Sequence, residues 1–431
     1  MKRFVWLLAL GACDDGGESG GDAGTAPVFV VQHVQTLPFG AEDNSEVVKL
    51  LPSGDKAVLV ASKGRKITLL GVSPTGLTEL QSVTLFGEDG GESELTHIDF
   101  DSQGRFAAVT HTLPVVTDGA VTDCQGELVF INVQPGEAFG QILAQVPVGP
   151  YPDAVDISDD DGWVVTADEV DFNDGKCPVD SVTGSISVIE LVSGDPTQAR
   201  VRGRVVMDET AGGGRREPEQ ILFGFDGDTV AATLQDTHEL VFFSVSELLA
   251  GAGEEVVERP VADFTLTRYP NREDGAEPWP DGLTRMRDAS GAEHFVASGE
   301  YNDTFAFFTP AGVFERQVAI SQADLPSDLP RNIEDWSLAP FRPDSVAAFR
   351  EGGKQYLAFS LKHAGAVGIW QADDLASVRV VGVAKVGLTE GGTSVTESTL
   401  GTEGIAAAEG GIIVTANEGE SSASLVRATV Q

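Results

Sequence analysis

Seven acidic residues, each at the start of an apolar run, recur at intervals of 48 to 66 residues along this chain of 431 residues. They are Glu46, Glu94, Asp153, Glu219, Asp281, Asp344 and Glu403. Oxygen ligands gathered about one axis are what a hard cation such as Ca²⁺ requires. Carboxylates that lie close together cannot all remain ionised unless a cation or hydrogen-bond donors compensate them. If the fold brings the seven together, the sequence predicts an acidic ring that can hold Ca²⁺.

A second set of polar residues follows the second apolar run of several repeats, where we expect it to face the same ring. Its members are Asp168, Glu169, Glu300, Asn417 and Glu418, together with the histidines His238 and His363. Two interpretations of the ring acids remain open. They could accept backbone N–H bonds from neighbouring loops and only tie the repeats together, which their presence in every repeat favours. Alternatively, a subset could also bind a metal ion.

Each acidic opening leads into the same series of a short strand, a turn rich in Asp or Gly, a second strand, a loop and a third strand. Self-similarity at this period is typical of propellers and solenoids. The second strands, such as residues 56–61 and 162–167, follow turn signals such as that at residues 52–55. Helical periodicity is nearly absent, with residues 246–250 as the single candidate turn. The sequence therefore predicts an all-β fold, a seven-bladed β-propeller.

The two ends of the chain are expected to close the ring. Residues 404–430 supply only three strands, and residues 28–37 form an apolar strand that has no partner in the first repeat. We expect this N-terminal strand to complete the last blade as its outer strand, which leaves no open edge at the seam. The predicted propeller domain spans residues 27–431.

The first residues have the pattern of an export signal. Lys2 and Arg3 form a basic region, residues 4–10 an apolar region much shorter than the ~20 residues of a membrane-spanning helix, and Leu10-Gly-Ala-Cys13 a cleavage site. This last sequence resembles the lipobox of bacterial lipoproteins. The resemblance implies a signal peptide over residues 1–12, a lipidated Cys13, a flexible acidic and Gly-rich tether over residues 13–26, and anchoring in the bacterial cell envelope, with the leaflet left open. An ordinary secretion signal with a chance cysteine is the alternative.

The two remaining cysteines, Cys124 and Cys177, each precede the third strand of their repeat. Equivalent loops of neighbouring blades lie on one face of a propeller, and exported proteins fold in an oxidising setting. The sequence therefore predicts a Cys124–Cys177 disulfide, for which the chain-entropy model gives about 4 kcal/mol. Two free thiols are the alternative.

Three groups of runs are more specific than the general propeller pattern: 151–155 with 165–174 and 184–189, 217–221 with 232–241, and 415–420. They resemble the bacterial choice-of-anchor I propellers, which are related to mesenchyme-specific cell-surface glycoproteins. The resemblance covers most of residues 41–430 and implies an exported, anchored propeller, without a settled reaction. The chain departs from the family where Asp168 replaces the usual asparagine and where His238 stands in the glutamine-loop repeat.

The formal net charge of −39 disfavours nucleic acid and anionic lipid as partners, since both require basic patches. We expect a monomeric, membrane-anchored binding module for a protein, glycan or small-molecule ligand, with Ca²⁺ as the candidate cofactor. The alternative is a Ca²⁺-dependent hydrolase of the lactonase or phytase kind, in which the ion polarises the substrate and His238 or His363 is the base.

Overall fold

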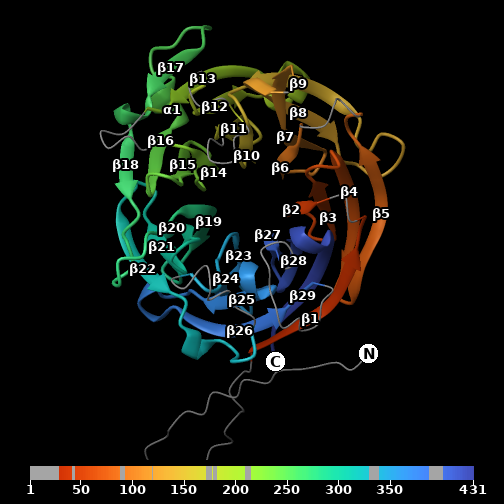
Figure 1. Cartoon of the computed structure of the whole chain (residues 1–431), viewed down its shortest axis with the longest axis vertical. Coiled ribbons are helices and arrows are strands. Elements are labelled where there is room, and N and C mark those ends of the chain that lie inside the picture. Colours follow the sequence, from red (N-terminus) through yellow and green to blue (C-terminus); the bar gives the residue numbers. More distant parts are fainter. Residues whose placement is uncertain are drawn as a thin grey trace, which may run out of the picture.

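The computed structural model describes residues 29–40, 44–87, 93–118, 120–170, 177, 182–208, 215–329, 339–387 and 401–431. Seven β-sheets surround a central channel, which confirms the predicted seven-bladed propeller (Figure 1). The predicted signal peptide, Cys13 and the tether lie outside the described residues. Within the described ranges, no helix is long and apolar enough to cross a membrane.

The first four blades are numbered here along the chain, each from its inner strand outward. Blade 1 contains β2 (Ser45–Leu50), β3 (Lys56–Ala61), β4 (Lys66–Ser73) and β5 (Gly76–Thr84). Blade 2 contains β6 (Leu95–Phe100), β7 (Phe106–Thr117), β8 (Ala120–Asn132) and β9 (Ile142–Val148). Blade 3 contains β10 (Pro152–Ile157), β11 (Trp163–Asp168), β12 (Ser185–Glu190) and β13 (Arg200–Val206). Blade 4 contains β14 (Pro218–Phe223), β15 (Thr229–Leu234), β16 (Glu239–Ser244) and β18 (Thr265–Arg268).

The last three blades follow the same order. Blade 5 contains β19 (Pro280–Arg287), β20 (Glu293–Gly299), β21 (Thr304–Phe308) and β22 (Phe314–Ala319). Blade 6 contains β23 (Val346–Glu351), β24 (Lys354–Leu361), β25 (Ala366–Gln371) and β26 (Arg379–Lys385). Blade 7 contains β27 (Thr402–Ala408), β28 (Ile412–Asn417), β29 (Ser422–Val430) and β1 (Phe29–Pro38).

Few elements depart from this plan. The connection between β16 and β18 contains α1 (Val245–Leu248), near the predicted turn, and β17 (Val257–Pro260), which pairs in parallel with β13 as a fifth strand of blade 3. The remaining helical segments are 3-10 turns of three residues each: Val192–Gly194, Pro196–Gln198, Val261–Asp263, Gln322–Asp324, Lys362–Ala364, Leu375–Ser377 and Glu418–Glu420.

The N-terminal strand closes the ring as predicted. β1 pairs antiparallel with β29, from Phe29 opposite Val430 to Pro38 opposite Ser422, and both lie at the seam in Figure 1. Residue 28, the first of the predicted strand, lies outside the described residues. The two strands at the seam are hydrogen-bonded to each other, so blade 7 has four strands, like every other blade except the five-stranded blade 3.

Apolar side chains pack between neighbouring blades. Between blades 5 and 6, the ring of Phe305 lies 5.0 Å from that of Phe359 and 4.9 Å from that of Trp370, and all three are fully buried. A buried side chain of this kind stabilises the fold by about 1.5–3 kcal/mol. The uninterrupted apolar second strands are therefore those of sheets covered on both faces, and their packing fixes the inner strands around the channel.

In six blades the inner strand begins with a bulge, where the register against the second strand shifts. A bulge leaves a residue unpaired and redirects its side chain. The first unpaired residue of each is Glu46, Thr96, Asp153, Glu219, Asp281 and Glu403. The bulge therefore places five of the ring acids, whereas blade 2 has Thr96 at this position and Asp344 of blade 6 precedes β23.

Blade 2 does not have the predicted carboxylate at this position. In the other blades, the N–H that follows the second strand donates to the carbonyl two residues before the ring acid, as Glu169 does to Tyr151 at 3.0 Å. In blade 2, Thr112 donates to the carbonyl of Glu94 at 2.9 Å, so the ring-acid position falls on Thr96. The prediction of seven equivalent carboxylates is wrong here, because Glu94 begins an apolar run two residues out of register.

Candidate functional site

A cavity of about 600 Å³ occupies the channel mouth. It lies at the inner strands, which Figure 1 shows around the centre of the ring. Carboxylates from all seven blades meet there, and Glu94 lines it despite its shifted register. The predicted site residues in its lining are Glu46, Glu94, Asp153, Glu169, Glu219, Asp281, Glu300, Asp344 and Glu403.

Six of these residues form two acidic triads of the same construction. The first acidic triad is Asp153, Glu169 and Glu219, and the second is Asp281, Glu300 and Asp344. Each triad combines the ring acid of one blade, the glutamate after the second strand of that blade, and the ring acid of the next blade. Within each triad, one carboxylate oxygen from every member lies within 4.8 Å of the others.

Basic side chains of the chain itself compensate the second acidic triad. The Arg342 Nε lies 2.5 Å from Glu300 Oε1, and the Lys362 Nζ lies 3.3 Å from Asp344 Oδ2. Lys362 also pairs with Glu403, the ring acid of blade 7. Neither basic residue was predicted at the site, although Arg342 stands two residues before a ring acid and Lys362 directly follows a second strand. These ion pairs supply positive charge to two of the three carboxylates of the second acidic triad.

Glu219 of the first acidic triad lies in a different environment. Burial raises the pKa of its carboxyl well above the usual range, and the nearby carboxylates of Glu169, Asp153, Asp281 and Glu300 raise it further. Its Oε2 atom is buried and has no hydrogen-bond partner in the described part of the chain. An oxygen in this setting requires a proton or a cation, because a buried unpaired charge is strongly disfavoured.

Blades 7 and 1 meet in a related arrangement of acids. Burial and the carboxylates of Glu418 and Asp153 raise the pKa of Glu46 to about 8. The Asn44 amide donates to Glu418 Oε1 at 3.1 Å. Glu418 does not belong to the cavity lining described above, but its carboxylate raises the pKa of Glu46 at the mouth.

Asp168 and Asn417 lie away from the cavity, which corrects their prediction as ligands. Asp168 is buried within blade 3, where its carboxylate accepts hydrogen bonds from Thr166, Ser185 and Ser187 at 2.7–2.8 Å. Burial, opposed by these hydroxyl donors, raises the pKa of Asp168 to about 6. Alternation along the second strand directs both side chains into the blade. The Asn417 amide contacts hydroxyls of Thr402, Thr415, Ser422 and Ser424.

The predicted base candidates do not line the cavity either. His238 is buried with its ring 5.9 Å from that of Trp279, and His363 is buried in the 3-10 turn after β24. The histidine in the described lining is His97, which the sequence reasoning missed. Burial, and then the charge of Lys49, lower the pKa of His97 to about 3, so its imidazole is neutral. Its place in the inner strand, directly after the ring position of blade 2, was the available signal.

Other acids, deeper in the channel, tie the blades together. Asp99 Oδ2 accepts the Ile157 N–H at 2.9 Å, and Asp156 Oδ2 accepts the Phe223 N–H at 2.8 Å, each across a blade boundary. In the described part of the chain, the ring acids Glu46, Glu219 and Asp281 accept no backbone N–H. The architectural interpretation thus describes a second layer of acids better than it describes the ring.

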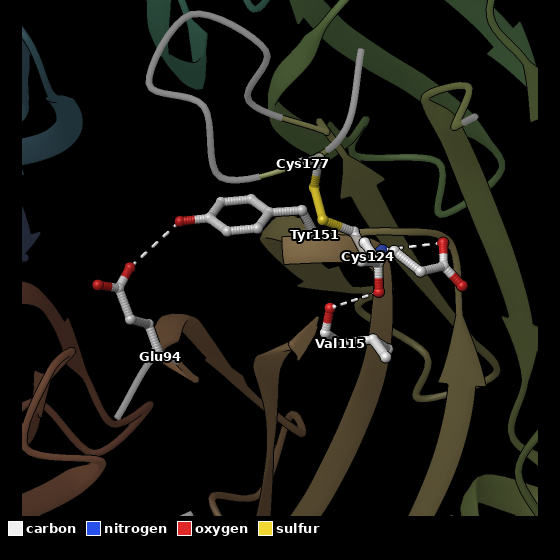
Figure 2. The surroundings of a disulfide bond; sticks show 7 residues. Glu94, Val115, Cys124, Tyr151 and Cys177 are labelled. Atoms are coloured by element: carbon white, nitrogen blue, oxygen red, sulfur yellow. Dashed lines mark hydrogen bonds between the residues drawn. A yellow bond between two sulfur atoms is a disulfide. The ribbon is translucent and has the colours of Figure 1, made fainter. Parts of the chain in front are cut away.

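The predicted disulfide is confirmed beside the acidic mouth. Cys124 and Cys177 are joined with their Cα atoms 5.5 Å apart (Figure 2). Together with Tyr151 and Val170 they form a buried group, here named the disulfide cluster. The Tyr151 hydroxyl reaches from this cluster into the mouth and donates to Glu94 Oε2 at 3.2 Å (Figure 2).

Comparisons with solved structures support the fold alone. The virginiamycin B lyase of Staphylococcus aureus is 12% identical, with a TM-score of 0.52 over 93% of this chain and 99% of the lyase. The hydrazine synthase of Kuenenia stuttgartiensis is 13% identical, with a TM-score of 0.56 over 90% of this chain and 97% of that one. A putative 6-phosphogluconolactonase of Bacteroides fragilis is 12% identical, with a TM-score of 0.51 over 88% and 89%.

The sequence comparison is more specific. No curated protein matches the chain. Residues 46–236 match the family model of the choice-of-anchor I domain. These residues form blades 1 to 3 and the first half of blade 4, and they include the whole first acidic triad and the disulfide. The match of residues 46–236 of this seven-bladed propeller to the choice-of-anchor I domain agrees with the family that the resemblance of its sequence runs predicts.

Proposed function

We propose that the chain is an exported, membrane-anchored binding module. It binds a divalent cation at the first acidic triad, and Ca²⁺ is the ion that we propose. The observation that carries the proposal is Glu219, whose buried Oε2 atom lies among carboxylates and has no hydrogen-bond partner among the described residues. The choice-of-anchor I match and the disulfide support an extracytoplasmic location. Anchoring through lipidated Cys13 is part of the proposal.

The dimensions of the first acidic triad fit such an ion. Ca²⁺ binds oxygens at about 2.3–2.6 Å, so ligands on opposite sides of the ion are about 4.8 Å apart. The oxygens of Asp153, Glu169 and Glu219 lie within 4.8 Å of one another. Three carboxylates leave further coordination positions on the cavity side, where oxygen groups of a glycan, protein or small molecule could complete the shell.

Calorimetric titration of the full chain with Ca²⁺ tests this function. We expect Glu219→Gln to abolish Ca²⁺ binding and the accompanying rise in melting temperature, because it removes one of the three carboxylates of the first acidic triad. The stabilisation lost should be about 2.7 kcal/mol at a hundredfold excess over the Kd. The matched control is Asp344→Asn in the second acidic triad, which should retain binding. Identical melting curves of the unmodified protein in Ca²⁺ and in chelator would end the proposal.

The anchor has its own test. Cys13→Ser removes the acylated thiol, and we expect the protein to leave the membrane fraction and to lose the mass of its acyl chains. A membrane-bound Cys13→Ser protein would contradict lipidation at this residue and favour the ordinary secretion signal.

A Ca²⁺-dependent hydrolase of the lactonase or phytase kind is the second candidate, and one observation favours it. Neutral His97 lines the same cavity as the first acidic triad, where its imidazole could donate a hydrogen bond to the carbonyl or phosphoryl oxygen of a bound substrate. The test is hydrolysis of lactones and phosphate esters with Ca²⁺, comparing the unmodified protein with His97→Ala. Under the binding function we expect no turnover from either protein.

A further inference from the structure

Two of the three carboxylates of the first acidic triad adjoin the disulfide cluster. Tyr151 precedes Asp153 by two residues, and Val170 directly follows Glu169. The Glu169 N–H donates to the Tyr151 carbonyl at 3.0 Å, which joins the two segments through their backbones. The cluster is therefore joined directly to the backbone segments that carry Asp153 and Glu169.

Val170 has an unusual backbone for its residue type. Its φ is +89°, and the residue is fully buried. A β-branched residue with positive φ is a genuine outlier, and such a conformation persists only where the surrounding structure holds it. The buried groups around Val170 include Cys124, Tyr151 and Cys177. The strained residue thus directly follows Glu169, a proposed metal ligand. The disulfide is part of the buried cluster that surrounds Val170.

Different residues adjoin the second acidic triad at the positions equivalent to Tyr151 and Val170. In blade 5, Trp279 and Tyr301 occupy the positions of Tyr151 and Val170, and their rings stack with centroids 4.7 Å apart. Tyr301 is not among the residues with positive φ. Glu300 there pairs with Arg342. The second acidic triad, whose charge Arg342 and Lys362 compensate, thus adjoins an aromatic stack. Of the two triads, the one that we assign to the cation is the one that adjoins the strained valine and the disulfide.

We propose that the disulfide cluster positions Glu169, so that the affinity of the first acidic triad for a divalent cation depends on the Cys124–Cys177 bond. This inference rests on the proposed function. With the bond intact, Val170 is held in its strained conformation and Glu169 faces the other two carboxylates. A dithiol supplies two electrons and two protons, the S–S bond becomes two thiols, and the dithiol is oxidised to its own disulfide. Val170 then relaxes and Glu169 turns away.

The first experiment is calorimetric Ca²⁺ titration of the full chain before and after treatment with a dithiol. We expect the Kd to rise at least tenfold on reduction, and the double variant Cys124→Ser, Cys177→Ser to behave like the reduced protein. If the oxidised protein binds no Ca²⁺, the proposed function fails and this inference fails with it. If both redox states bind equally, only the positioning role is overturned.

Val170→Gly separates positioning from general stability. Glycine adopts a positive φ without the steric cost that valine carries. When Val170→Gly is added to the double serine variant, we expect the Kd for Ca²⁺ to fall at least threefold, while the melting temperature stays low. A loss of affinity that glycine does not recover would assign the effect to destabilisation and overturn the proposal.

A second variant keeps the test independent of the disulfide. Tyr151→Ala opens the cluster while the cysteines remain joined, and we expect it to weaken Ca²⁺ binding at least fivefold. Unchanged affinity in folded Tyr151→Ala protein would contradict the role of the cluster. The control is Trp279→Ala at the equivalent position of blade 5, which should leave Ca²⁺ affinity unchanged.

Discussion

Asp168 and Asn417 hold the same position in blades 3 and 7, as the last residue of the second strand, and hydroxyl groups of the blade enclose both side chains. The hydroxyls around Asn417 both donate to its Oδ1 and accept from its Nδ2. Serine and threonine hydroxyls can rotate to either role. The two pockets therefore share hydroxyl partners, but Asp168 Oδ2 also accepts the Gly149 N–H at 3.1 Å, and the two side chains differ in charge.

We expect Asp168→Asn to change how stability depends on pH. The pKa of Asp168 in the folded protein, about 6, lies above the ordinary value of 3.8. Its contribution to the free energy of unfolding is therefore fully present below about pH 4 and is lost as the pH rises through 6. At pH 7.5 the variant should be more stable than the unmodified protein by about 1–3 kcal/mol. Urea unfolding at pH 4 and pH 7.5 measures this. A difference between the two proteins that is the same at both pH values would contradict it.

Ca²⁺ stabilisation should grow with pH. Burial and the neighbouring carboxylates raise the pKa of Glu219 well above its usual range, so protons compete with the cation for this carboxylate more strongly as the pH falls. We expect a larger Ca²⁺-induced shift in melting temperature at pH 8.5 than at pH 5.5. A shift that is independent of pH would exclude Glu219 as a ligand. The control is the same titration in Glu219→Gln protein.

Lys362→Met tests the internal ion pairs of the second acidic triad. Lys362 pairs with Asp344 and Glu403, and methionine leaves both carboxylates without their cation. Removal of one partner from a largely buried pair typically costs about 3–5 kcal/mol. We expect a loss of this size for Lys362→Met and a smaller loss for Lys362→Arg, which keeps the positive charge. Denaturant unfolding of both variants is the measurement, and equal losses would contradict the electrostatic origin.

Removal of β1 tests the closure of the ring. Deletion of residues 1–38 exposes the edge of β29 and uncovers the interface that Val31 makes with blade 6. We expect the truncated protein to melt at a markedly lower temperature and to associate through the free edge. Size-exclusion chromatography and thermal unfolding measure both effects. Deletion of residues 1–26, which retains β1, is the control and should leave a monomer of unchanged stability.

Local patterns in the sequence predicted much of the architecture. Seven similar series of strand and turn signals predicted the number of blades, because each blade is formed by one copy of the same sequence pattern. The unpaired N-terminal strand predicted the closure through β1 and β29, and the equivalent positions of Cys124 and Cys177 predicted the disulfide. These features depend on the order of elements along the chain, which the sequence displays directly.

The tertiary structure alone decided which residues form the site. A register difference of two residues separates Glu94 from the ring position that Thr96 holds, and strand alternation turns Asp168 into its blade while Glu169 faces the cavity. Arg342 and Lys362 neutralise one of two similar triads. These outcomes depend on pleat, bulges and distances between residues from different blades. Charges and hydrogen bonds act over a few ångströms in space, and only the folded ring brings those atoms that close.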